Sequence, residues 1–238
     1  MGRAYEVRKA SILKTGAAKA KLYSMYAKEI YEATKSGGTE TESNAVLKRL
    51  IERAKKDQIP SDIIKRAIDK VNSGIDESYI SVRYELFGPG GATAIVDCLT
   101  DNVNRTLSYI RPALNKNNGK MGVSGSVVHM YEHLCVVSFK GLSEEQVIDA
   151  MINGDIDVDD IEVENDTVTI YGKPQDLYKI KEIIVNLLPK VEFEAEEITM
   201  IPKGQVTLEG EDKEDFNKMI AMIDEIEDVQ NVYHNVQL

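Results

Sequence analysis

Ten basic side chains near the start of this sequence have the types and spacing to bind phosphates. They are Arg3, Arg8, Lys9, Lys14, Lys19, Lys21, Lys28, Lys48, Arg49 and Arg53. Residues 1–75 carry 16 Lys and Arg against 9 Asp and Glu, a net charge of +7, whereas residues 76–238 carry 13 against 31, a net charge of −18. A local excess of positive charge binds polyanions with salt-dependent and largely sequence-independent affinity. The split therefore predicts that residues 1–75 bind nucleic acid.

Aromatic side chains lie among these charges and could stack on unpaired bases. They are Tyr5, Tyr23, Tyr26 and Tyr31. Tyr26 falls on an apolar stripe, so we expect it in a core instead. The alternative for the basic residues is a solvated helix surface, because Lys and Arg populate the outside of most helices. The contrast with the acidic remainder favours nucleic acid.

A second polar cluster, residues 101–106, reads Asp-Asn-Val-Asn-Arg-Thr. Asp101 or Asn102 is sufficiently explained as a helix cap. Asn104 and Arg105 are not needed for capping, so we treat them, together with Arg83, as a candidate contact surface.

Catalytic and metal-binding patterns are not apparent in the sequence. No Ser-His-Asp order, nucleophile elbow or catalytic carboxylate pair stands out, so we expect no catalytic residue, no cofactor and no small-molecule substrate. Counted from Asp155, the acidic run that begins there has Asp160 and Asp166 where a calcium loop needs glycine at the sixth and glutamate at the twelfth position, so it predicts a solvated strand edge. Cys98 and Cys135 lie in apolar runs without zinc-ligand spacing, which predicts reduced buried thiols and no metal site.

The basic residues must be positioned by helices, because apolar residues recur with helical spacing up to residue 71. Gly37-Gly38 ends the first predicted helix, Ser43 or Asn44 caps the second, and Pro60-Ser61 opens the third, which Gly74 stops. From residue 79 the pattern changes to short strands. The strands Ile80–Phe87 and Ala92–Leu99 flank a glycine-rich run that predicts a hairpin turn and lacks the lysine of a phosphate loop.

The next segment predicts a helix that contains Pro112, a glycine-rich loop, Gly119–Gly125, and a strand, Ser126–Tyr131. Residues 134–201 then alternate as strand, helix, strand, strand, helix, strand, which is the order of a ferredoxin-like unit. Ser143 and Gln146 predict a capping box at the first of these helices, and Pro174 opens the second. A final helix and a strand, Val229–Val236, close the chain.

This order predicts an α+β fold with three domains. The closing helix and strand cannot bury their apolar faces alone, so we expect them to complete the sheet begun at residue 79. The predicted domains are a basic helical bundle (1–75), a discontinuous α+β domain (76–132 plus 205–238) and a ferredoxin-like α+β domain inserted into it (133–204).

The composition is that of an ordinary soluble protein, with 42% hydrophobic and 29% charged residues. The longest apolar stretches have the length of strands, and the first residues lack the apolar core of a signal peptide. We therefore expect a cytoplasmic protein without a membrane partner.

Several stretches together resemble the YebC/PmpR family. They are Arg83-Tyr84-Glu85 leading into Phe87-Gly88-Pro89-Gly90-Gly91, residues 99–106, residues 122–127 and Tyr131. Met1-Gly2-Arg3 and the ending Val232–Val236 are more similar to its YeeN branch. The resemblance implies a helical N-terminal domain followed by two α+β domains. Family members are described as probable transcriptional regulators that bind DNA, and others as translation factors that relieve ribosomes stalled on proline runs. The family's usual His-Ser-Lys-Trp stretch is replaced here by Arg3-Ala4-Tyr5.

The leading hypothesis is therefore a non-enzymatic regulator of gene expression that binds nucleic acid, with DNA as the target that the resemblance implies. The alternative is a ribosome-associated translation factor that binds ribosomal RNA. No recognition helix with base-reading Arg, Asn or Gln stands out, and the tyrosines are available for stacking, which favours RNA. An enzyme with a site between domains is a remote alternative.

Overall fold

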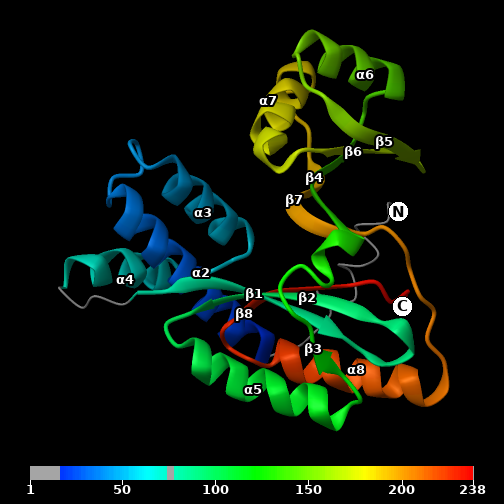
Figure 1. Ribbon diagram of the computed structural model, residues 1–238. Helices are drawn as coiled ribbons and strands as arrows, with labels where there is room; N and C mark the ends of the chain where they lie inside the picture. The colour runs from blue at the N-terminus through cyan, green and yellow to red at the C-terminus, as the bar shows by residue number, and fades with distance from the viewer. Residues whose placement is uncertain (1–16, 74–77, 238) are drawn as a thin grey trace. The chain divides into compact units, whose positions relative to one another are not determined.

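The computed structural model describes residues 17–73 and 78–237, and these form an α+β fold of helices and two antiparallel four-stranded sheets (Figure 1). Arg3, Arg8, Lys9 and Lys14 lie outside the described residues. Within residues 17–73 and 78–237, no helix is long and apolar enough to cross a membrane.

Three helices form the first described segment and confirm the periodicity of the sequence. They are α2 (Ala17–Gly37), α3 (Ala45–Lys56) and α4 (Ser61–Asn72). Their shared core consists of Tyr26, Ile30, Ala33, Leu47, Ala54, Ile59, Ile64 and Ala67. Burial of this apolar stripe, more than helix propensity, stabilises helices of this length. Gly74, the predicted stop of the third helix, lies outside the described residues.

Asn44 links the end of α2 to the start of α3. Its Oδ1 accepts a hydrogen bond from the Leu47 backbone N–H at 3.0 Å, and its Nδ2 donates to the carbonyl oxygens of Ala33 and Gly38, each at 2.8 Å. Of the two predicted caps, Ser43 and Asn44, the structure assigns this role to Asn44, whose side chain is buried.

We expect Asn44→Ala to lower the free energy of unfolding by about 2 kcal/mol, because it removes a helix cap and leaves two carbonyls without this donor. Urea denaturation of the full chain measures the loss. Ser43→Ala is the control, since the exposed Ser43 hydroxyl bonds only the Glu40 carbonyl in this turn, and it should cost less than about 0.5 kcal/mol. Equal losses for the two variants would argue against the capping role.

The first sheet has the strand order β3-β1-β2-β8. Its strands are β1 (Ile80–Phe87), β2 (Thr93–Thr100), β3 (Lys120–Met121) and β8 (Val229–His234). The predicted hairpin of β1 and β2 is confirmed, and its turn is the 3₁₀ helix η1 (Pro89–Gly91). Gly90 and Gly91 have φ angles of 61° and 82°, a region that glycine enters at little cost. Helices α5 (Val103–Lys116) and α8 (Gly210–Asp224) lie side by side along this sheet (Figure 1).

The strand predicted at residues 126–131 is wrong. Residues 124–127 form a turn, η2 (Val128–Met130) is a 3₁₀ helix, and a strand begins only at Tyr131. The Met130 N–H donates to the Val127 carbonyl at 2.9 Å, a hydrogen bond of η2, and Val127 is fully buried. Its apolar side chain therefore packs from a turn, although in the sequence it resembles part of a strand.

The second sheet has the order β5-β6-β4-β7 with all neighbours antiparallel, which is the ferredoxin-like arrangement that the sequence predicts. Its strands are β4 (Tyr131–Lys140), β5 (Val158–Glu164), β6 (Thr167–Gly172) and β7 (Phe193–Pro202). Its helices are α6 (Glu144–Asn153) and α7 (Leu177–Leu187), which follows the short η3 (Pro174–Asp176). The predicted capping box of Ser143 and Gln146 is present.

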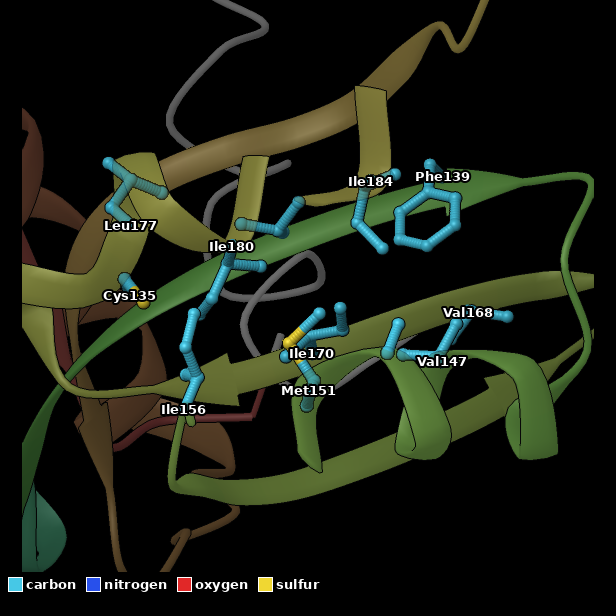
Figure 2. Packing of buried hydrophobic residues seen from close by; sticks show 12 residues of the cluster. Cys135, Phe139, Val147, Met151, Ile156, Val168, Ile170, Leu177, Ile180 and Ile184 are labelled. Atoms are coloured by element: carbon cyan, nitrogen blue, oxygen red, sulfur yellow. The ribbon is translucent and has the colours of Figure 1, made fainter. Parts of the chain in front are cut away.

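Figure 2 shows the core of this second unit, where side chains of β4 and β6 pack against α6 and α7. Phe139, Ile170 and Ile180 are each fully buried there. Burial of side chains of this size is worth about 1.5–3 kcal/mol each, so the second sheet has a substantial core of its own.

The strands of the first sheet come from two separate parts of the chain. β1 to β3 lie within residues 80–121 and β8 within 229–234, whereas every strand of the second sheet lies within 131–202. We propose on this basis that residues 133–204 are a domain inserted into one made of 76–132 and 205–238. The domain boundaries themselves stay a prediction.

Candidate nucleic-acid interface

Helix α3 has an exposed face on which basic side chains outnumber acidic ones. Leu47 and Ala54 are fully buried and so fix which side of the helix points outward. The exposed basic residues are Lys48, Arg49, Arg53, Lys55 and Lys56. Glu52 is the acidic residue of α3, so five positive charges against one negative give the helix a net charge of +4. This face has the charge that attracts a phosphate backbone.

Arg53 is fixed in place by its neighbours. Its Nε donates to the Tyr26 hydroxyl at 2.8 Å, its Nη2 lies 3.9 Å from Glu29 Oε2, and its guanidinium lies 5.2 Å from the Tyr26 ring centre. Burial raises the pKa of Tyr26, whose hydroxyl donates to Asp57. Tyr26 is only 1% exposed and Tyr31 only 2%, so neither ring presents a face for base stacking. Tyr26 therefore lies in the core as predicted, and Tyr23 is partly buried beside it.

The three predicted lysines of α2 differ in their surroundings. Lys19 is exposed. Lys21 Nζ donates to the Asp224 carbonyl at 2.6 Å, and Lys28 Nζ lies 2.9 Å from Asp228 Oδ1, with the Lys28 side chain only 9% exposed. A buried ammonium paired with a carboxylate is not available to a phosphate, so the position of Lys28 fits a structural role and not the predicted contact.

Asp228 is the centre of a buried polar cluster, which we call the Asp228 cluster. Its carboxylate accepts hydrogen bonds from the side chains of Lys28 (2.9 Å), Thr106 (2.8 Å), Thr100 (3.1 Å) and Arg105 (3.1 Å). These donors come from α2, α5 and the end of β2. Burial opposes the charge of the carboxylate, but the hydrogen bonds from Lys28, Thr106 and Arg105 lower the pKa of Asp228 below its ordinary value. The cluster therefore joins helix α2 to the first sheet and α5.

The candidate contact surface of Arg83, Asn104 and Arg105 has mixed properties. Arg83 Nε and Nη2 bind the two carboxylate oxygens of Asp97 at 2.6 and 2.8 Å. Arg105 donates to Asp101 at 2.6 Å and also to Asp228. The hydrogen bond to Asp101, and after it the one to Asp228, are the main causes that raise the pKa of the Arg105 guanidinium. The charges of both arginines are thus balanced by carboxylates, whereas Asn104 is exposed. The cap of α5 is Asn102, which accepts from the Arg105 N–H at 3.1 Å.

Sequence reasoning missed Asp228. It lies in the acidic stretch 224–228, where nothing distinguishes it from its exposed neighbours Glu225 and Glu227. Its donors lie between 122 and 200 residues earlier in the chain. To predict this cluster from the sequence, one would need to know that β8, the strand directly after Asp228, pairs with β2.

The acidic run and the cysteines have ordinary environments. Asp157, Asp159 and Asp160 are exposed at or before β5, an edge strand, as predicted. Cys98 and Cys135 are buried free thiols, and burial raises their pKa to about 12 and about 11, respectively. Among the residues with a described position, no group of three or more His, Cys, Asp or Glu side chains could hold a metal ion.

The helical bundle with a basic outer helix and the two antiparallel sheets define an α+β protein with a distinct positively charged helical part. The chain belongs to the TACO1/YebC family. The model for the N-terminal domain of that family matches residues 3–74, and the model for its second and third domain matches residues 79–236.

Relatives and a solved structure agree with this assignment. The chain is 46% identical over 238 residues to a "Probable transcriptional regulatory protein" of Vibrio parahaemolyticus, with both chains covered in full. It is 45% identical to a protein of the same name from Shewanella oneidensis, covering 100% of this chain and 99% of the relative. The crystal structure of a conserved hypothetical protein from Aquifex aeolicus matches with a TM-score of 0.75 and 33% identity, covering 94% of this chain and 92% of that one. The family resemblance and the α+β fold are thereby confirmed.

Proposed function

We propose that this protein is a non-enzymatic regulator of gene expression that binds nucleic acid through the outer face of α3. The exposed excess of positive charge on α3 is the observation that carries the proposal. Relatives named as probable transcriptional regulatory proteins support a regulatory role, and duplex DNA is the target that we propose for it. We expect the exposed cations of α3 to contact phosphates and not base edges, because they form a cluster of charge without a pattern typical of base recognition.

Charge reversal on α3 tests this proposal. We expect Lys48→Glu, Arg49→Glu and Lys55→Glu together to weaken binding to duplex DNA about tenfold or more. Each lost phosphate contact should also reduce the slope of log affinity against log salt by about 0.9. Arg53 is left unchanged, because its contacts with Tyr26 and Glu29 are structural. Fluorescence anisotropy at several salt concentrations measures both quantities.

The matched control reverses three exposed lysines of the second unit, Lys179→Glu, Lys190→Glu and Lys203→Glu, and so changes the net charge by the same amount. If binding depends on α3, this control should keep most of the affinity. Equal weakening by both variants would show that only overall charge matters and would overturn the proposal. A fragment of ribosomal RNA in place of duplex DNA separates transcriptional regulation from the ribosome-associated alternative, since the preferred target should bind more tightly at raised salt.

A further inference from the structure

A stretch of the acidic part of the chain contains no acidic residue at all. Residues 76–238 hold 31 Asp and Glu in 163 positions, about one in five, yet the 30 residues 102–131 hold none. A stretch of this length with average composition would carry about six. Its basic residues are Arg105, Arg111, Lys116 and Lys120. The stretch includes helix α5 and strand β3, so these two elements contribute no negative side chain of their own to the surface.

The outward side of α5 concentrates this property. Thr106, Ile110, Ala113 and Leu114 are its buried residues and define the inner face. The outer face has one stripe at positions i, i+4, i+7 and i+11 and two residues of an adjacent stripe. These exposed residues are Asn104, Ser108, Arg111 and Asn115, with Tyr109 and Lys116 beside them. Tyr109 is 55% exposed, whereas Ile110, Ala113 and Leu114 of the same helix are buried.

These side chains could contact the base, the phosphates and the sugar of an unpaired RNA strand. The Tyr109 ring can stack on a base, which is worth about 1–3 kcal/mol for each base stacked. Arg111 and Lys116 can bind phosphates on either side of it. The amides of Asn104 and Asn115 and the hydroxyl of Ser108 can both donate to and accept from the 2′-hydroxyl, the group that distinguishes RNA from DNA.

Two neighbouring features would support such a site. Arg105 is held by Asp101 and Asp228 and so fixes the first turn of α5. The cations that would bind the RNA strand are therefore Arg111 and Lys116. Helix α8, which packs beside α5, begins with the acidic residues Glu211, Asp212, Glu214 and Asp215. Their charge repels phosphate and so limits the strand to the face of α5.

We propose that the outer face of α5 is a binding site for an unpaired RNA strand. Its residues are separate from those of α3, so this site is independent of the interface proposed above and adds to it. Recognition of this kind depends on base stacking as well as charge, and it is less sensitive to salt than backbone binding alone.

Anisotropy of a labelled single-stranded RNA of mixed sequence with the full chain tests the proposal. Tyr109→Ala should weaken binding roughly tenfold, within the range that one stacked base provides, whereas Tyr109→Phe keeps the ring and should preserve affinity. The pair Arg111→Glu and Lys116→Glu should weaken it by a similar factor. The matched control is Lys213→Glu with Lys218→Glu, an equal charge change on exposed positions of the adjacent α8, which should leave the affinity within about twofold.

These measurements need a control for folding. A circular dichroism melt shows whether each variant is folded, and Tyr109→Phe tests the ring without a change of packing. If the wild-type chain binds no single-stranded RNA, or if Tyr109→Ala and the α8 control behave alike, the site is wrong. Equal affinity for a single DNA strand of the same sequence would contradict the proposed preference of this site for RNA. If the α3 charge reversals weaken RNA binding and the α5 substitutions do not, the proposed function is supported and the α5 site is wrong.

Discussion

Replacement of Asp228 by alanine is expected to lower the free energy of unfolding by about 3–5 kcal/mol, the usual cost of removing one partner from a buried ion pair. The carboxylate lies 2.9 Å from Lys28 Nζ, and the Lys28 and Asp228 side chains are 9% and 3% exposed. Without it the buried ammonium has lost its counter-ion, and the hydroxyls of Thr100 and Thr106 lose an acceptor. Denaturation in urea, monitored by circular dichroism, measures the difference.

Asp97→Ala is the control for this prediction, because Asp97 forms an ion pair with Arg83 that is even shorter, at 2.6 Å, but lies at a more exposed position. It should cost at most about 1 kcal/mol. Adding Lys28→Met to Asp228→Ala removes the unpaired charge and should recover part of the stability. If Asp228→Ala costs no more than Asp97→Ala, the Asp228 cluster does not stabilise the fold as we describe.

Acidification from pH 7.5 to pH 5 is expected to remove about 2 kcal/mol of stability through His234 alone. His234 is buried at the end of β8, and burial lowers its pKa from 6.5 to about 4, although a backbone hydrogen bond with Val236 partly opposes this. Between those two values the unfolded chain binds a proton at this position that the folded chain does not. Stability therefore rises with pH across this window and falls as the pH drops from about 6.5 towards 4, where the total loss approaches about 3 kcal/mol.

The variant His234→Gln carries no titrating group at this position, so its stability should change less between pH 7.5 and pH 5 than that of the wild type. The comparison is of the change with pH and not of the stability at one pH, since the substitution itself disturbs a buried site. Asp228 does not interfere with this comparison, because its pKa is lowered below the ordinary aspartate value, so the stability that it contributes is lost at pH values below the window compared here. Parallel pH profiles for the two proteins would refute the role of His234.

Features encoded by neighbouring residues could be predicted from the sequence. The stripe of Tyr26 and Ile30, the capping box at Ser143 and the hairpin around Gly90 each depend on residues within a few positions of one another. The α+β fold followed from the order of such elements. The exposed basic residues of α3 could also be predicted, since Leu47 and Ala54 fix the face that is buried.

Features that depend on distant contacts could not be predicted. The buried ion pair joins Lys28 to a residue 200 positions later, and the same charge at Lys19 is exposed, so spacing alone does not separate the two. The apolar residues around Val127 predict a strand, because apolar content does not distinguish a buried turn from a buried strand. The polar residues Arg83 and Arg105 predict a contact surface, and their spacing does not show that Asp97 and Asp228, on other strands or segments, accept hydrogen bonds from them.

The interrupted first sheet has a consequence for the order in which this chain folds during synthesis. The second sheet is encoded without interruption between residues 131 and 202, so it can form as soon as that stretch has been made. β1, β2 and β3 are made earlier but must wait for β8, and Lys28 waits with them for Asp228. Until then β2 has an unpaired edge that invites pairing with other chains. Pausing of the ribosome between residues 202 and 229 should therefore prolong the state of this protein that is most prone to aggregate.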